Sequence, residues 1–251
     1  MCRHLAYLGP RVRLSDLLLD PPHSLLRQSW EPRRQRYGRM NADGFGVGWY
    51  ADAAPEGEPE ELAPARYRRE LPMWADANLP SIARTIRSGA VLAAVRSATD
   101  GMAHSEGAVA PFASGPWLFS HNGRIADWPD SAAPLAAQLP AADLVALDAA
   151  SDSALLWALT RARLEKDPSL AAALAAVVEL AAPVGGRRLN FLLTDGAAVA
   201  ATAWGDTLCY LVGERSVVVA SEPHDDEPGW IDVPDRSLLL ATAGDVALTP
   251  L

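Results

Sequence analysis

The second residue of the chain, Cys2, combines a side chain and a position that together predict chemistry. Met1 is commonly removed when the next side chain is small, and Cys2 would then carry the α-amine. An α-amine has a reference pKa of about 7.7–8.0, so a fraction is unprotonated at neutral pH. Such an amine can take the thiol proton during attack and return it to a leaving group. The alternative is a cysteine that merely happens to be second.

A second group of polar residues, Ser120-His121-Asn122-Gly123-Arg124, follows the apolar run 117–120. We expect that run to be a strand that ends at Ser120. The side-chain amide of Asn122 and the backbone N–H of Gly123 could then point at one spot beyond the strand end. Such a donor pair forms an oxyanion hole. The alternative is an Asn-Gly hairpin turn, which is a frequent use of this dipeptide.

Two charged residues, Arg96 and Asp152, are suited to binding an α-amino acid head group. Arg96 ends the apolar run 91–95, and Asp152 stands between two serines at an expected helix start. A guanidinium binds a carboxylate, and a carboxylate binds an ammonium. Taken singly, Arg96 also fits a surface arginine and Asp152 a helix cap. A glycine-rich run, 40–49, predicts a turn feeding a strand that tolerates close backbone approach.

Metal and disulfide chemistry are not expected. The only cysteines are Cys2 and Cys209, too few for a disulfide framework or a four-ligand zinc site, and Cys209 lies in an apolar run typical of a buried strand. The run His224-Asp225-Asp226-Glu227 superficially resembles a metal cluster, but four consecutive side chains in an extended loop cannot all point at one ion. We therefore predict no metal site, and a reaction carried by the Cys2 thiol and its own amine needs no organic cofactor.

The composition is that of an ordinary globular chain, and it excludes several classes of protein. The 251 residues carry 22 Lys plus Arg against 31 Asp plus Glu, a formal net charge of −9, so general nucleic-acid binding is not expected. The sequence contains no stretch of ~20 apolar residues, so we predict no membrane span. The start lacks the pattern of a signal peptide, so we expect a cytoplasmic protein. We expect one domain over residues 1–251.

The elements that must position these residues follow from hydrophobic periodicity and turn residues. We expect strands at 2–8, 44–51, 62–70, 90–96 and 117–120, and helices at 15–19 (capped by Ser15), 80–87, 153–164 and 169–181. The segment 52–61 reads as a solvated hairpin loop, and 21–41, with four arginines between residues 33 and 39, as a long surface loop near a site.

The last third of the chain is rich in strands. Five apolar runs, at 190–194, 199–204, 207–212, 216–220 and 237–242, are separated by turn residues and predict an antiparallel meander. Strands at both ends with helices between them favour an α+β fold of two packed antiparallel sheets covered by helices.

The order of these motifs resembles the class II glutamine amidotransferases of the N-terminal nucleophile superfamily. Cys2 is followed by Asn41-Ala42-Asp43-Gly44, Arg96-Ser97-Ala98-Thr99, His121-Asn122-Gly123 and Ser151-Asp152-Ser153. The resemblance implies a four-layer αββα sandwich. It implies Cys2 as nucleophile and base, and Asn122 and Gly123 as the oxyanion hole. It also implies that Arg96 binds the substrate α-carboxylate and Asp152 its α-amine, with Ser97, Thr99 and His121 further substrate-binding residues.

Further motifs are similar to one subfamily, whose members hydrolyse γ-glutamyl-hercynylcysteine sulfoxide in ergothioneine biosynthesis. They are Met1-Cys2-Arg3-His4, Asp20-Pro21-Pro22, Trp204-Gly205-Asp206-Thr207-Leu208 and Ala220-Ser221-Glu222-Pro223. Larger amidotransferases carry Trp and His where this chain has Ser97 and Asp100. The partner is thus a small γ-glutamyl molecule. Alternatives are another γ-glutamyl peptide, a glutaminase subunit feeding a synthase, or a binding protein without turnover. No oligomeric state follows from the sequence.

The leaving half of that substrate carries a trimethylammonium group, which aromatic faces and carboxylates attract. Trp230 lies just after the acidic run 225–227. We therefore expect the segment 222–230 to form a loop over the mouth of the site, with a solvated acidic turn and a core tryptophan as the alternative.

Overall fold

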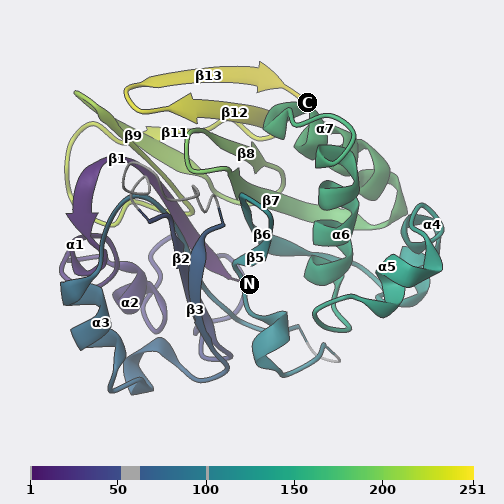
Figure 1. Cartoon of the computed structure of the whole chain (residues 1–251), viewed down its shortest axis with the longest axis horizontal. Coiled ribbons are helices and arrows are strands. Elements are labelled where there is room, and N and C mark those ends of the chain that lie inside the picture. The colour runs from purple at the N-terminus through teal and green to yellow at the C-terminus, as the bar shows by residue number, and fades with distance from the viewer. Residues whose placement is uncertain (1, 52–62, 100–101) are drawn as a thin grey trace, which may run out of the picture.

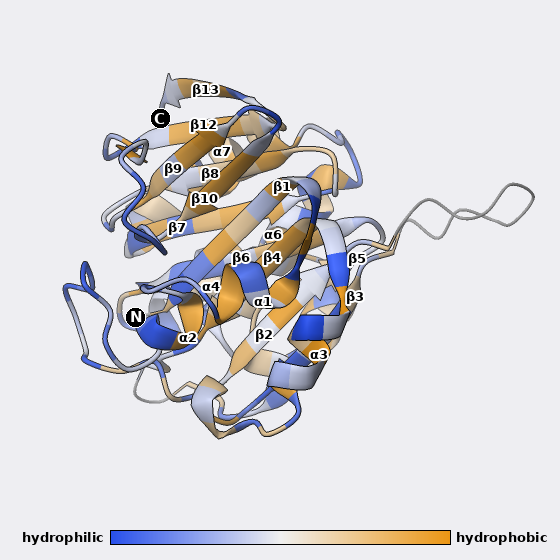
Figure 2. Ribbon diagram, turned by 90° about the vertical axis from the view of Figure 1, so that its left-hand side faces the viewer, coloured by the Kyte–Doolittle hydropathy of each residue, from blue (hydrophilic) through white to orange (hydrophobic). Residues whose placement is uncertain are grey.

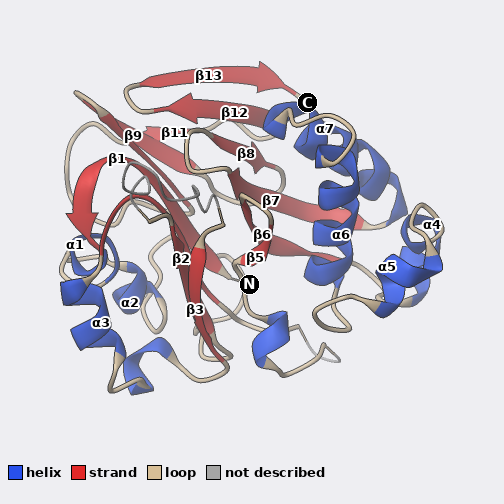
Figure 3. Cartoon of the chain, viewed as in Figure 1, coloured by secondary structure: helices blue, strands red, loops and turns tan. Residues whose placement is uncertain are grey.

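The computed structural model describes residues 2–51, 63–99 and 102–251. In this part of the chain, two antiparallel sheets lie face to face, and helices cover the outer face of each (Figures 1 and 3). The predicted α+β class, with its helix–sheet–sheet–helix layers, is therefore confirmed. The expected loop 52–61 and the substituted Asp100 lie outside the described residues.

The first sheet has the strand order β11-β9-β10-β1-β4-β2-β3. Its strands, in chain order, are β1 (Arg3–Arg13), β2 (Phe45–Trp49), β3 (Ala65–Arg69), β4 (Arg87–Val95), β9 (Cys209–Gly213), β10 (Ser216–Ala220) and β11 (Ile231–Asp232). The second sheet has the order β13-β12-β8-β7-β6-β5. Its strands are β5 (Phe112–Ser114), β6 (Trp117–Ile125), β7 (Gly186–Thr194), β8 (Val199–Ala203), β12 (Ser237–Thr242) and β13 (Asp245–Pro250).

Each sheet is covered by its own helices. The first carries α1 (Leu14–Leu18), α2 (Leu25–Gln28) and α3 (Leu79–Thr85), and the second carries α6 (Asp152–Leu164) and α7 (Leu170–Ala181). The short helices α4 (Ala133–Ala136) and α5 (Ala141–Val145) pack on α6. Short 3₁₀ turns lie at Met73–Ala75, Glu106–Ala108, Asp130–Ala132 and Ala182–Val184. No helix in the described ranges is long and apolar enough to cross a membrane.

The central strands of each sheet are largely apolar on both faces because both of their faces are covered, whereas edge strands such as β3 and β13 are mostly exposed. In β1, Ala6 and Leu8 contribute to the core between the sheets, while Leu5 and Tyr7 pack toward α1–α3. This division follows from the alternation of side chains along a strand. The second sheet behaves in the same way, with Phe191 directed toward α6 and α7. Figure 2 shows strands such as β8, β10 and β12 largely in hydrophobic colours.

Most predicted elements are confirmed to within a few residues, but three expectations are wrong. The helix expected at 15–19 begins at Leu14, and its N-cap is Arg13 rather than Ser15. The strand expected to end at Ser120 continues to Ile125, because residues 118–125 pair with β7. The Asn122-Gly123 pair therefore lies inside a strand and forms no hairpin turn.

The third wrong expectation is the meander. β7 and β8 pair in the second sheet, the chain then crosses to the first sheet for β9, β10 and β11, and it returns for β12 and β13. The crossing begins at Gly205, whose φ of +81° suits a glycine. Apolar alternation identifies these runs as strands but does not assign them to a sheet, since both sheets face the same inner core.

Candidate active site

The central strands of the two sheets bring the predicted site residues together. In the first sheet, Arg3 of β1 pairs with Val95 of β4, so Cys2 comes next to the end of β4. The thiol of Cys2 is 3.9 Å from the carbonyl oxygen of Ser97. In the facing sheet, β6 presents Asn122 toward Cys2. Cys2 therefore lies at the edge of the first sheet where β1 begins and β4 ends, and it faces β6 of the second sheet.

The backbone nitrogen of Cys2 points at Asn122. It donates a hydrogen bond to the side-chain oxygen of Asn122 at 3.1 Å. The amide nitrogen of Asn122 donates to Asp206 at 3.3 Å. An amide NH₂ has two N–H donors, so one remains for a ligand. Asn122 thus orients the nitrogen of Cys2 and keeps one N–H free for a ligand.

A buried ion network lies behind Asn122. Arg3 is fully buried, and its guanidinium lies 3.3 Å from Asp206 and 3.7 Å from Glu222. Its Nε donates to the carbonyl oxygen of Cys2 at 2.9 Å. Both ends of the Cys2 backbone are therefore fixed by the same network. An interior ion pair is rigid when its charges are paired and hydrogen-bonded, as they are here.

Sequence reasoning assigned no role to Arg3 or Asp206. Both stand in motifs that were noted only as subfamily resemblance, Met1-Cys2-Arg3-His4 and Trp204-Gly205-Asp206-Thr207-Leu208. These motifs are about 200 residues apart, as the Arg3–Asp206 separation of 203 shows. An Arg next to the nucleophile and an Asp after a Trp-Gly turn were the available signals, but only the fold brings them together.

A cavity lies on the sulfur side of Cys2. It is lined by Cys2, Arg96, His121 and Ser153, with apolar residues of β4 and of the 108–112 segment. Arg96 is 8% exposed, and one of its terminal nitrogens donates to the carbonyl oxygen of Ala103 at 2.9 Å. The other, Nη1, has no partner in the part of the chain that the structure describes. An unpaired buried guanidinium nitrogen is costly unless a ligand pairs with it.

His121 and Ser153 are polar residues of the second sheet and of α6 that line this cavity. His121 bonds through Nδ1 to the Ser153 hydroxyl at 3.0 Å and through Nε2 to the carbonyl oxygen of Arg188 at 3.1 Å. Burial lowers the pKa of His121, and the Asp152 carboxylate partly opposes this effect, so the ring is neutral at neutral pH.

Asp152 begins α6. Its carboxylate accepts from the backbone N–H of Ile125 at 3.0 Å and of Ser153 at 2.7 Å. Ser151, and not Asp152, caps the helix, by accepting from the N–H of Ala154. The Ser153 hydroxyl also donates to it, at 3.3 Å, and these three bonds still leave acceptor capacity on the carboxylate. Asp152 does not itself line the cavity, although its neighbour Ser153 does.

The other predicted residues, Gly123, Ser97 and Thr99, lie in backbone segments around the cavity. Gly123 is tightly packed, since an added Cβ would lie 1.9 Å from the carbonyl oxygen of Arg188 and 2.3 Å from Nε2 of His121. The segment with Ser97 and Thr99 is held by Asp43, whose carboxylate accepts from the N–H of Ala98 at 2.8 Å. Thr99 does not line the cavity. The structure thus gathers Cys2, Arg96, His121 and Asn122, with the other predicted residues around them.

The glycine-rich strand and Cys209 agree with their predictions. An added Cβ on Gly46 would lie 2.3 Å from the carbonyl oxygen of Ala110, so β2 requires glycine there. Cys209 is fully buried, and burial raises the pKa of its thiol. An inert, protonated thiol results.

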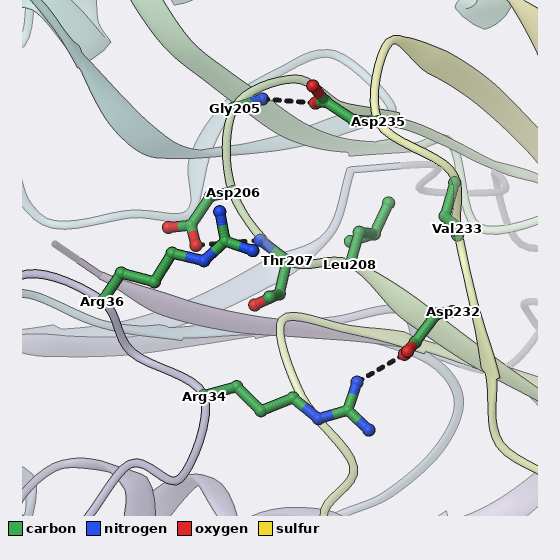
Figure 4. A pocket seen from close by; sticks show the side chains of 9 residues that line it. All are labelled: Arg34, Arg36, Gly205, Asp206, Thr207, Leu208, Asp232, Val233 and Asp235. Atoms are coloured by element: carbon green, nitrogen blue, oxygen red, sulfur yellow. Dashed lines mark hydrogen bonds and ion pairs between the residues drawn. The ribbon is translucent and has the colours of Figure 1, made fainter.

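A second cavity, which we call the Arg36 pocket, lies on the other side of Asp206. Figure 4 shows its lining residues, among them Arg34, Arg36, Asp206 and Asp232. The arginines come from the 21–41 segment, so this segment does lie near a cavity, and it also contains α2.

The predicted role of the 222–230 segment is wrong. Glu222 is fully buried and accepts from the backbone N–H groups of Arg33 and Arg34 at 2.9 and 2.8 Å. Trp230 donates through its indole N–H to Asp225 at 2.7 Å and packs edge-on against His224. None of these residues lines the cavity of Cys2. The segment secures the arginine loop, and Trp230 packs against the core of the first sheet.

The fold and this arrangement define a class of enzyme. The family model described as "Glutamine amidotransferases class-II" matches residues 18–214. The chain therefore belongs to the class II glutamine amidotransferases, and the resemblance read from its motifs is confirmed.

Full-length relatives point to one member of this family. The chain is similar to the γ-glutamyl-hercynylcysteine sulfoxide hydrolase of Mycolicibacterium smegmatis, with 44% identity over 251 residues that cover 100% of both chains. It is also 44% identical to the protein of the same name from Mycobacterium tuberculosis, covering 100% of this chain and 97% of that one.

Solved structures agree with the family. A glutamine aminotransferase class-II domain protein from Silicibacter pomeroyi superposes with a TM-score of 0.68 at 26% identity, over 99% of both chains. The glutamine phosphoribosylpyrophosphate amidotransferase of B. subtilis has a TM-score of 0.64 at 14% identity, covering 99% of this chain and 49% of that one, and supports the fold alone.

Proposed function

We propose that the protein hydrolyses the γ-glutamyl amide bond of γ-glutamyl-hercynylcysteine sulfoxide. The products are glutamate and hercynylcysteine sulfoxide, an intermediate of ergothioneine biosynthesis. Full-length identity of 44% to hydrolases of this name supports the choice of substrate. The observation that carries the chemistry is the division around Cys2, whose nitrogen is held by Asn122 while its thiol adjoins the Arg96 cavity.

The glutamyl half of the substrate occupies the Arg96 cavity in this proposal. Nη1 of Arg96, which has no described partner, pairs with the α-carboxylate. The free acceptor positions of Asp152 take the α-ammonium group. His121 is neutral and adds no charge that would repel that ammonium. The γ-carbonyl then reaches the thiol of Cys2.

The reaction proceeds through a thioester. The α-amine of Cys2, freed by removal of Met1, takes the thiol proton as the sulfur attacks the γ-carbonyl carbon. The remaining N–H of Asn122 and the backbone N–H of Gly123 stabilise the oxyanion. The Cys2 ammonium returns the proton to the departing amine, and the C–N bond breaks. The amine then takes a proton from water, which attacks the thioester and releases glutamate.

A panel of substrates tests this proposal. Protein with Cys2 at its N-terminus is assayed with γ-glutamyl-hercynylcysteine sulfoxide, glutamine and glutathione, and release of glutamate is measured. We expect the highest kcat/KM for the first. Preference for glutamine would favour an ammonia-supplying subunit, and preference for glutathione a different γ-glutamyl hydrolase. If none of the three releases glutamate, the protein would instead be a binding protein without turnover.

A further inference from the structure

The Arg36 pocket carries charges of both signs beside the catalytic residues. It has a volume of about 240 Å³, slightly below the usual range of small-molecule sites, and it is open to solvent on one side. Two of its lining residues also contact the network that holds Cys2. Asp206 accepts from Asn122 at 3.3 Å, and the hydroxyl of Thr207 accepts from Arg3 at 3.3 Å. The pocket is thus separated from the nitrogen of Cys2 by Asn122 and Asp206.

Arg36 is the charged residue of this pocket that lacks a partner. Arg34 is ion-paired with Asp232, Asp235 accepts from the N–H of Gly205, and Asp206 is paired with Arg3. Arg36 makes no hydrogen bond or ion pair with the described residues. In Figure 4 its guanidinium extends into the pocket, toward Asp206 and Thr207.

The reaction geometry directs the leaving half toward this pocket. The departing nitrogen receives its proton from the α-amine of Cys2, so it must lie on the nitrogen side of that residue. That side faces Asn122 and, behind it, Asp206. The glutamyl half lies on the opposite, sulfur side, in the Arg96 cavity. The leaving half therefore departs on the side of Cys2 on which the Arg36 pocket lies.

The charges fit a zwitterion better than a simple anion. Asp206 and Asp232 are already ion-paired with Arg3 and Arg34, which leaves one positive and one negative lining residue, Arg36 and Asp235, without an ion-pair partner among the described residues. The far end of hercynylcysteine sulfoxide is a histidine betaine, which bears a carboxylate and a trimethylammonium on one carbon. A guanidinium binds the carboxylate in a forked geometry, and the quaternary ammonium needs only nearby negative charge because it has no N–H to donate.

We propose that the Arg36 pocket is the binding site for the betaine end of the leaving half. Arg36 pairs with the betaine carboxylate, and Asp235 and Asp232 face the trimethylammonium. This assignment rests on the proposed function. It places substrate specificity in the 21–41 segment and the 205–208 turn, outside the residues that carry out the bond cleavage.

The test compares two substrates in the same enzyme. The ratio of kcat/KM for γ-glutamyl-hercynylcysteine sulfoxide to that for γ-glutamylcysteine, which lacks the betaine, is measured for the wild type, Arg36→Ala and Arg39→Ala. Arg39 is an equally exposed arginine of the same segment that does not line the pocket. We expect Arg36→Ala to lower the ratio about tenfold, as loss of one charge-assisted contact would. Arg39→Ala should leave it unchanged.

A substrate analogue without the betaine carboxylate completes the test. The wild type should use it about tenfold less well than the full substrate, and Arg36→Ala should cause no further loss. An unchanged ratio in Arg36→Ala, or an equal fall in Arg39→Ala, overturns the assignment while leaving the hydrolase proposal intact. A wild type that does not cleave the full substrate overturns the proposed function itself.

Discussion

The two sides of Cys2 are built in opposite ways. On the nitrogen side, Asn122, Asp206 and Arg3 are at most 6% exposed and bond to one another and to the Cys2 backbone. On the sulfur side, the thiol makes a single long contact of 3.9 Å, and Nη1 of Arg96 has no partner in the described chain.

This difference separates positioning from binding. A fully paired polar network fixes its members in one arrangement, because any rotation leaves a buried group unpaired. A buried donor without a partner gains free energy when a ligand supplies the missing acceptor. The nitrogen side should therefore govern turnover, and the sulfur side should govern affinity for the glutamyl group.

The largest effect is expected where the two sides meet. Cys2→Ala removes the nucleophile, and retention of Met1 removes the free amine, so either change should abolish measurable turnover. Activity is measured on the processed enzyme, on Cys2→Ala and on a form with a blocked N-terminus. The thermal midpoint of each serves as the control for folding. Full activity of the blocked form would refute the N-terminal nucleophile.

The next effect concerns the nitrogen side. Asn122→Ala should lower kcat by about 10²–10³, because it removes an oxyanion donor, and should change KM less. Thr194→Ala is a matched control, since Thr194 is a buried polar residue of the same β6–β7 pair whose hydroxyl bonds to Ala198 and Gly196, away from Cys2. If both variants lose the same kcat, Asn122 acts only through the stability of the strand pair.

A substitution on the sulfur side should change KM more than kcat. Arg96→Ala removes the proposed partner of the α-carboxylate and should lower kcat/KM about 10- to 100-fold, mainly through KM. Esterifying the α-carboxylate should cost the wild type a similar factor and cost the variant little. If the variant and the wild type discriminate equally against the ester, Arg96 does not bind that carboxylate.

The sequence allowed the residues on the sulfur side to be predicted more readily than those on the nitrogen side. Arg96, His121 and Cys2 stand at the ends of apolar runs or at the chain start, and such positions are recognisable without a fold. Arg3 and Asp206 come together across 203 residues, and Asp206 arrives by a crossover between sheets. Apolar alternation does not encode that crossover, since both sheets share one inner core.

The fold class was predictable for a related reason. Helical and strand periodicities are local, so the layers follow from them, and most elements have the expected bounds. Pairing partners are not local. The extension of β6 to Ile125 depends on pairing with β7. Polar residues such as His121 and Asn122 break the apolar pattern, so the sequence does not indicate that the strand continues through them. The interpretation of Trp230 failed similarly, because its packing on His224 depends on tertiary contacts.

A smaller effect is expected from the second layer on the nitrogen side. Asp206→Asn keeps the shape of the side chain but removes its charge, so Asn122 is held less firmly and kcat should fall about tenfold with little change in KM. A carboxylate near an ammonium favours the charged form. Its loss should therefore move the acidic limb of the kcat/KM profile to lower pH.

Asp143→Asn provides the control for Asp206→Asn, since Asp143 pairs with Arg161 and is not part of the Cys2 network. It should leave the pH profile in place. A fall in kcat for Asp206→Asn without movement of the acidic limb would mean that Asp206 acts only by holding Asn122.

The smallest expected effect is on stability, and it involves both sides. Burial lowers the pKa of His4, which bonds to Ser120 between the sheets, and of His121 on the cavity wall. Below about pH 6.5, the ordinary pKa of histidine, the unfolded chain therefore binds more protons than the folded one. Above about pH 6.5 these histidines should not reduce the free energy of unfolding. Below that pH the free energy of unfolding should decrease, by about 1.4 kcal/mol per histidine for each pH unit between its unfolded and folded pKa. Urea unfolding at a series of pH values measures this slope. His4→Gln should reduce it, whereas substitution of the exposed His104 should not. An unchanged slope in His4→Gln would show that other groups carry the acid sensitivity.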